Sequence, residues 1–208
     1  ADVSAPTSGR RLRWDNSGSV GEGVLVSNAA TSDVATPDLP CWNMFLALKA
    51  YAKNRYIRGV GGAGGDETYH AFLTPTAMMR LKQDPNFRDN LRHAQQRGDG
   101  NDLFTGSNSV KIDGVHLHEF RHVYNTSGAT TKWGGGSVDG CQVLFCGAQA
   151  LGMADLGAPY WDEEGFDYSN QQGISVGKIL GFKKPKFESI YEAGASEDFG
   201  VISCYVAQ

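Results

Sequence analysis

The sequence predicts an α+β fold with a mostly antiparallel sheet, and three observations lead to that class. A long amphipathic helix pattern precedes several short strand-like runs, an Asp-Gly turn separates two of those runs, and strand-like runs close the chain. Regular alternation of strands and helices, which would indicate a parallel sheet, is absent. With 208 residues, of which 40% are hydrophobic and 20% charged, the chain can form one large domain or two small ones.

Residues 1–37 are predicted to form an extended arm. They are rich in small and polar residues and contain one short apolar run, Val24-Leu25-Val26. A segment with so little apolar surface cannot offset its own ordering entropy. We therefore expect it to be held by something outside itself, and we expect its removal to leave the rest of the fold intact.

The strongest helix signal covers residues 38–58. Asp38 can cap its start, Pro40 falls in the first turn, where a missing N–H costs little, and Gly59 follows its end. Two adjoining apolar stripes run along it at helical spacing, so we expect it to pack on more than one side. At about 1.5 Å per residue, this helix is predicted to be roughly 30 Å long.

Two proline-containing dipeptides predict two short helices. Residues 69–73 are strand-like, and Thr74-Pro75 then combines an N-cap residue with a proline at the first helical position. Asp84-Pro85 repeats that arrangement and begins a second helix that fades near residues 97–98.

Asp113-Gly114 lies between β-rich runs and predicts a hairpin over residues 110–124. The acidic stretch at 162–167 lacks the alternating oxygen ligands of a calcium-binding loop, so a solvated loop is the better interpretation. The other expected elements are a glycine-rich loop at 126–140, a buried strand at 141–145, a small-residue helix at 148–154, and strands at 173–182 and 199–207.

The stretch from His118 to His122 reads HEFRH and matches the HExxH pattern of zinc peptidases. That chemistry needs a helix, which places both histidines on one face one turn apart. Here the stretch follows an Asp-Gly turn and continues an alternating strand pattern. On a strand the two histidines would be about 13 Å apart, too far to share a metal. Strand histidines at a surface or a subunit contact are the preferred interpretation.

The remaining chemical signals point away from an enzyme. Two glycine-rich stretches, at 59–64 and 173–179, lack the strand-loop-helix context or the residues of a phosphate-binding loop. The four cysteines form no CxxC pair, so we expect reduced thiols and no metal or other cofactor. No coherent nucleophile set is present, which favours a structural or binding protein.

The charge balance also limits the partners. The net charge of −4 argues against binding nucleic acid by bulk electrostatics, although a local basic patch is compatible with it. The basic sets at residues 80–92 and 183–186 are interpreted as solvated faces or intersubunit contacts. Because no run of about 20 apolar residues is present, we expect no membrane span.

Several stretches, in this order and spacing, give the chain from about residue 38 to 207 a family resemblance. They are HAFLTP (70–75), NDLFTG (101–106), IDGVHLHE (112–119), LFCGAQA (144–150), EEGFDYSNQ (163–171), GISVG (173–177) and FGVI (199–202). Together they resemble the major capsid proteins of tailed phages with the Hong-Kong-97-type fold. Members of that family usually have a longer N-terminal portion before their extended loop.

The resemblance implies a domain arrangement. It makes residues 38–69 the long spine helix of the peripheral domain and a glycine-rich link, and residues 70–165 the axial domain, a mixed, mostly antiparallel sheet with flanking helices. Residues 166–208 would supply the returning strands of the axial domain and the peripheral-domain sheet. Residues 1–37 would correspond to the extended loop that overlaps a neighbouring subunit. Its cluster of Arg10, Arg11, Arg13 and Trp14 would then be a subunit contact.

The implied function is that of a virion structural protein without catalysis. The chain would assemble with itself, through pentamers and hexamers, into an icosahedral shell that encloses phage DNA without sequence specificity. Scaffolding, portal or cementing proteins would be further partners, the virion its location, and the host cytoplasm the place of assembly. Two alternatives remain open from the sequence: a zinc metallopeptidase that uses residues 118–122, and a small non-enzymatic binding module.

Overall fold

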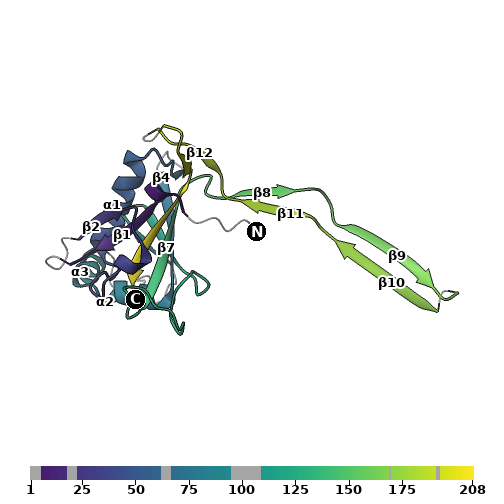
Figure 1. The fold of residues 1–208 in the computed structure, drawn as a ribbon, viewed down its shortest axis with the longest axis horizontal. Helices are drawn as coiled ribbons and strands as arrows, with labels where there is room; N and C mark the ends of the chain where they lie inside the picture. Colours follow the sequence, from purple (N-terminus) through teal and green to yellow (C-terminus); the bar gives the residue numbers. More distant parts are fainter. Residues whose placement is uncertain (1–5, 18–22, 62–66, 95–108, 169, 191–192) are drawn as a thin grey trace.

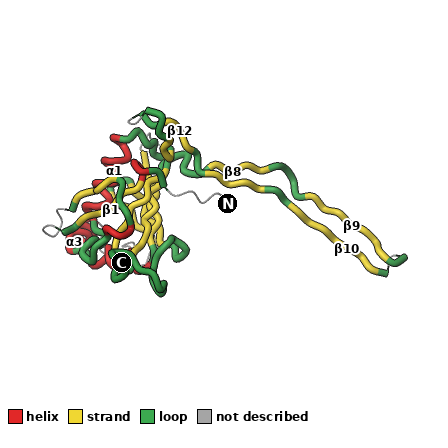
Figure 2. Tube along the Cα trace, in the orientation of Figure 1, coloured by secondary structure: helices red, strands yellow, loops and turns green. Residues whose placement is uncertain are grey.

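An α+β body with one long projecting hairpin makes up the molecule (Figure 1). The structure is a computed structural model, and it describes residues 6–17, 23–61, 67–94, 109–168, 170–190 and 193–208. In Figure 2 the strands form the sheet of the body and most of the hairpin, with short loop segments between its proximal and distal strand pairs and at its tip, whereas the helices are confined to the body. The predicted α+β class is therefore confirmed.

One mixed sheet organises the body. Its strands follow the order β2 (Val24–Ser27), β1 (Arg11–Asp15), β14 (Val201–Ala207), β7 (Gly140–Cys146), β4 (Glu67–Leu73), β6 (Val115–Glu119) and β5 (Ser109–Ile112), and the short β3 (Val60–Gly61) pairs with β4. The pairs β1–β14 and β4–β6 are parallel, and the other pairs are antiparallel. The sheet is thus mostly antiparallel, as the sequence predicts.

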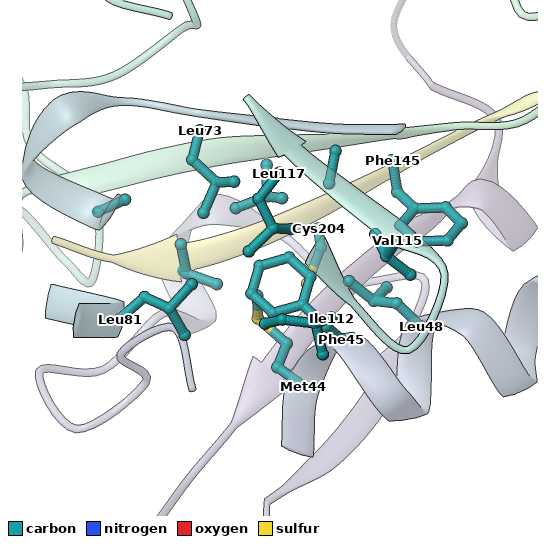
Figure 3. Packing of buried hydrophobic residues seen from close by; sticks show 14 of the residues in the cluster. Met44, Phe45, Leu48, Leu73, Leu81, Ile112, Val115, Leu117, Phe145 and Cys204 are labelled. Carbon is teal, nitrogen blue, oxygen red and sulfur yellow. The ribbon is translucent and has the colours of Figure 1, made fainter. Parts of the chain in front are cut away.

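The core lies between the sheet and the helices. Three α-helices contribute to it: α1 (Trp42–Asn54), α2 (Pro75–Gln83) and α3 (Pro85–Ala94), with short 3-10 turns at Ser8–Arg10 and Thr31–Asp33. Figure 3 shows Met44, Phe45 and Leu48 of α1 packed against Leu117 and Phe145 of the sheet, all fully buried. Burial alternates along β4 and β7 because successive side chains of a strand point to opposite faces.

The two helix starts predicted from proline dipeptides are confirmed. The Thr74 hydroxyl accepts a hydrogen bond from the backbone N–H of Ala77, and Pro75 is the first residue of α2. At the next start, the Asp84 carboxylate accepts hydrogen bonds from the backbone N–H groups of Trp42 and Asn86. Asp84 therefore joins α3 to the first turn of α1. The expected end of α3 lies outside the described residues.

The first helix is shorter than the sequence predicts. Its 13 residues correspond to about 20 Å, and it ends at Asn54 rather than next to Gly59. Tyr56 has a positive φ of 56°, its N–H donates to the Lys53 carbonyl, and the Ile57 N–H donates to the Ala52 carbonyl. This pair of bonds is a Schellman motif in which a tyrosine occupies the position that usually holds glycine. The helix is thus about two turns shorter than the predicted 30 Å helix.

Asp38 does not cap that helix, which corrects the sequence interpretation. Cys41 occupies the N-cap position. The fully buried Asp38 carboxylate instead accepts hydrogen bonds from the backbone N–H groups of Asn16 and Ala35 and pairs with Arg13 at 3.4 Å. The Asp38 carboxylate thus holds the N-terminal segment against the loop that precedes α1.

The described part of the N-terminal segment differs from the predicted extended arm. β1 lies inside the sheet, parallel to β14 and antiparallel to β2. Leu12 and Trp14 on this strand are 0% and 1% exposed and belong to the core. The apolar residues of the segment are few, but β14 and α1 cover them. We now expect deletion of residues 1–37 to destabilise the sheet.

The predicted helix over residues 148–154 is wrong. Residues 148–151 turn away from the sheet, with Gln149 at a φ of 60°, and β8 (Gly152–Asp155) follows. β8 pairs with β11 (Leu180–Lys183), which brings Met153 opposite Phe182. The small residues of this stretch favour a helix locally, but pairing with a distant strand determines its structure.

The predicted turn and the glycine-rich loop are found where the sequence places them. The Asp113-Gly114 turn joins β5 to β6, although β6 ends at Glu119 rather than continuing to residue 124. In the predicted glycine-rich loop at 126–140, residues 126–139 contain no regular element and Gly140 already begins β7; Trp133 is 6% exposed and packs edge-on against Tyr205. All four cysteines are free, and burial raises the pKa of the Cys146 thiol to about 11. Within the described residues, no helix is long and apolar enough to cross a membrane.

The sheet face opposite the helices carries a histidine cluster, formed by His70, His116 and His118. The His70 Nδ1 and His118 Nε2 atoms are 2.9 Å apart, and the His70 ring also stacks on His116 at 5.3 Å. Desolvation lowers the pKa of both His116 and His118; Lys111 and His70 lower that of His116 further, and His70 and His116 lower that of His118 further. His116 and His118 are therefore stabilised in their neutral forms.

We expect Trp14→Ala to lower the free energy of unfolding by about 3–5 kcal/mol, because the change leaves a cavity in the core. Phe120→Ala is the matched control, since Phe120 is 52% exposed on the body and its loss should change stability by no more than about 0.5 kcal/mol. Urea denaturation followed by far-UV circular dichroism measures both. Equal effects would contradict the core position of Trp14.

The histidine cluster predicts a loss of stability in acid. A histidine whose folded pKa lies below its unfolded value of about 6.5 binds fewer protons in the folded state, so its stabilising contribution is present above that pH and disappears as the pH falls. We expect the urea midpoint to drop between pH 7.5 and pH 5, and to drop less for His118→Gln. An identical drop in the variant would show that the cluster does not contribute.

Candidate functional site

The most unusual surface in the molecule is the projecting hairpin, residues 151–183. It consists of β8 and β11 near the body and of β9 (Tyr160–Phe166) and β10 (Gln171–Gly177) at the far end. Of the 21 large hydrophobic side chains that are exposed in the described residues, 12 lie in residues 151–182. Exposed apolar surface concentrated in this way indicates an interaction site.

The distal hairpin, β9 and β10, has two chemically different faces. Trp161 lies opposite Val176, and Glu163 lies opposite Ile174, so these four residues share one face. Trp161, Ile174 and Val176 are 59–61% exposed. The Glu163 carboxylate accepts a hydrogen bond of 2.6 Å from the Trp161 indole N–H, which leaves the face mainly apolar.

The opposite face of the distal hairpin is acidic at its centre. Asp162 and Glu164 point to this side, between the aromatic rings of Tyr160 and Phe166. Each ring lies over a glycine of β10: a Cβ atom at Gly173 would be 2.8 Å from the Phe166 ring, and one at Gly177 would overlap Tyr160. The glycines are therefore needed where the two rings fold across the hairpin.

The proximal hairpin, β8 and β11, is apolar on one face. Met153 lies opposite Phe182, and Leu180 lies opposite Asp155 on the same side. Asp155 is paired with Lys178 at 2.8 Å, which neutralises the only carboxylate of that face. The apolar faces of both hairpins thus lack any cover from the described residues of the chain.

This geometry leaves the hairpin without support from the described residues. An isolated two-stranded ribbon is marginally stable in water, and its edges present unpaired N–H and C=O groups. Residues 152–166 extend over about 50 Å at 3.3 Å per residue, so the far end lies well away from its own body. The apolar face of the hairpin is therefore available to a surface that the described residues do not supply.

The sequence interpretation missed this site. The acidic stretch at 162–167 is exposed, as predicted, but most of it forms β9 rather than a loop. A usable signal was present: two seven-residue runs of mixed aromatic, β-branched and glycine residues flank the short turn at 167–170.

The residues predicted to form a subunit contact have partners within the chain, and the subunit contact itself stays a prediction. Trp14 is in the core, and Arg10 is 5% exposed and pairs with Glu197 at 3.4 Å. Burial lowers the pKa of Arg10, and Glu197 opposes that shift. Arg13 pairs with Asp15 at 2.6 Å, and Arg11 donates to the Asn28 side chain at 3.0 Å. The structure thus gives each of these residues a role within the chain.

The HExxH stretch does not form a zinc site in the structure. His118 lies in β6, whereas His122 lies in the turn after that strand. No group of three or more His, Cys, Asp or Glu side chains among the described residues could hold a metal ion. The strand prediction for His118 is therefore confirmed, and the helix that a zinc peptidase requires is absent there.

Comparison with known proteins gives one consistent result. A family model described as phage capsid protein matches residues 1–208. The major capsid protein of Pseudomonas phage KPP25 is 58% identical over 210 residues, which cover 100% of this chain and 54% of that protein. This chain therefore spans about half the length of that relative.

Solved structures agree with the fold. The capsid of Ralstonia phage GP4 matches with a TM-score of 0.64 and 21% identity, over 97% of this chain and 53% of that one. The capsid asymmetric unit of cyanophage Pam1 matches with a TM-score of 0.69 and 21% identity, over 96% and 54%. The family model matches the whole length and shows that this chain belongs to the phage capsid protein family, and the 58% identical relative agrees with it.

Proposed function

We propose that this chain is the major capsid protein of a phage, or the part of one that it spans, and that it builds a shell from copies of itself. The projecting hairpin is the observation that supports this most directly. It exposes an apolar face along a ribbon that reaches about 50 Å from the body, which suits a contact between neighbouring subunits. Membership of the capsid family supports the same function.

The finer parts of the proposal follow from the resemblance noted in the sequence. We propose a Hong-Kong-97-type arrangement with pentamers and hexamers in an icosahedral shell, assembled in the host cytoplasm and located in the virion. Packaged DNA would face the inner surface, and scaffolding, portal or cementing proteins would be further partners. Arg10, Arg11, Arg13 and Trp14 would support the shell indirectly, by fixing β1 in the sheet.

The proposed role is structural rather than catalytic. A zinc peptidase would need residues 118–122 on a helix, and the described structure places the first of them on β6. A monomeric binding module would leave the apolar face of the projecting hairpin in water, which costs free energy in proportion to its area. Self-association is therefore the property that separates the proposed function from that alternative.

We expect Trp161→Ser with Ile174→Ser to weaken self-association of the chain by at least about tenfold. Both side chains lie on the apolar face of the distal hairpin, and truncating an aromatic anchor of an interface typically costs about 2 kcal/mol or more. Sedimentation velocity over a range of concentrations measures the effect, and negative-stain electron microscopy shows whether rings or shells form.

Phe120→Ser is the matched control, because Phe120 is 52% exposed on the body rather than on the hairpin. It should associate like the unchanged chain. A single small species at every concentration for the unchanged chain would refute the proposed function, and equal association of the double variant would refute the role of the apolar face.

A further inference from the structure

The net charge of the molecule is concentrated at the far end of the projecting hairpin. Residues 160–177 contain four of the 23 acidic residues and none of the 19 basic ones. The rest of the chain therefore has 19 residues of each sign and no net charge. The distal hairpin is therefore strongly anionic, whereas the rest of the chain has no net charge.

The carboxylates of this end have no cationic partner in the described structure. Asp162 and Glu164 share the acidic face, and Asp167 lies in the turn between β9 and β10. No ion pair involves any of them among the described residues. An anionic face of this kind repels nucleic acid and attracts a cationic protein surface.

The outer surface of α2 and α3 has the complementary charge. Residues 75–94 contain four basic and two acidic residues, and the four basic ones are exposed: Arg80, Lys82, Arg88 and Arg92. The Asp84 carboxylate is already hydrogen-bonded to two backbone N–H groups.

These cations have little competition from within the chain. Arg80, Lys82 and Arg88 form no ion pair among the described residues, and Arg92 has only an exposed contact with Asp89 at 3.8 Å. An exposed pair of that kind contributes little to stability. By contrast, Lys49 and Lys184 elsewhere on the body pair with carboxylates at 2.8 Å.

The two charged surfaces of one molecule cannot meet. Figure 1 shows α2 and α3 on the side of the body away from the base of the projecting hairpin, with the distal hairpin pointing in the opposite direction. A second copy of the chain can supply the surface that matches each of them.

From these observations we propose that the acidic face of the distal hairpin docks on the α2–α3 surface of a second copy, with Asp162 and Glu164 against Arg80 and Arg88. The inference rests on the proposed self-assembly and specifies where the hairpin binds. The apolar face of the hairpin supplies area, and the acidic face sets orientation, because charge complementarity determines register and suppresses wrong partners.

Charge reversal between copies tests this docking. Asp162→Lys with Glu164→Lys reverses the charge of the acidic face of the hairpin. Arg80→Glu with Arg88→Glu reverses the charge of the α2–α3 surface. Each double variant alone should associate at least about tenfold more weakly than the unchanged chain, because like charges then meet at the contact. An equimolar mixture should recover association, since the reversed hairpin of one variant faces the reversed helices of the other. Sedimentation velocity with one variant fluorescently labelled measures this.

Arg58→Glu with Arg121→Glu is the matched control, because both residues are exposed cations of the body outside α2 and α3. This control should associate normally and should not rescue the reversed hairpin. Raising the salt from about 0.05 M to about 0.5 M should weaken association of the unchanged chain.

The outcomes separate the two proposals. Unchanged association of either reversed variant, or a mixture that does not recover, overturns the docking on α2 and α3. If association is still lost in the variant with serines at 161 and 174, self-assembly through the hairpin stands and only the docking site fails. A chain that never associates overturns both.

Discussion

The antiparallel pairing of β7 with β14 is the constraint on which the shape of the molecule depends. Seven residue pairs join the strands, from Gly140 with Ala207 to Cys146 with Val201, and the Gly147 N–H donates to the Gly200 carbonyl just beyond them. The two ends of the segment between these strands are thereby held side by side. Because its two ends are adjacent, the segment between them, residues 147–200, must leave the sheet and return to it. The projecting hairpin is the main part of that segment. The same pairing places β14 beside β1 and completes the core over α1.

Local sequence signals predicted the elements whose structure is decided locally. The Thr74 cap, the Asp84 cap and the Asp113-Gly114 turn each depend on hydrogen bonds or backbone angles within a few residues. The signals failed where distant contacts decide. The φ of Tyr56 ends α1 early, and pairing with β11 makes β8 a strand in spite of its small residues. The few apolar side chains of β1 are enough because α1 and β14 cover them.

The candidate site was harder to predict, because exposure is a property of the fold and not of a residue. Trp161, Ile174 and Val176 look like core residues in the sequence, and the carboxylates between them look like a solvated loop. A solvent-exposed two-stranded ribbon accounts for both patterns, because alternate residues of each strand point to opposite faces. Register therefore places Asp162 and Glu164 on one face and Trp161, Ile174 and Val176 on the other, where Glu163 accepts a hydrogen bond from Trp161; a shift of one residue would put apolar and unpaired acidic side chains on the same face.

The segregation of charge has a physical consequence for a molecule that contacts its own copies. Apolar burial is not directional, so a hairpin with only its apolar face could dock in several registers on any apolar surface. Four carboxylates without a basic residue beside them restrict the set of acceptable partners to cationic surfaces. Because the rest of the chain has no net charge, it adds no long-range electrostatic repulsion between copies. In the proposed assembly, the apolar face of the ribbon supplies affinity and the acidic face sets orientation, so docking on neighbouring copies is selective.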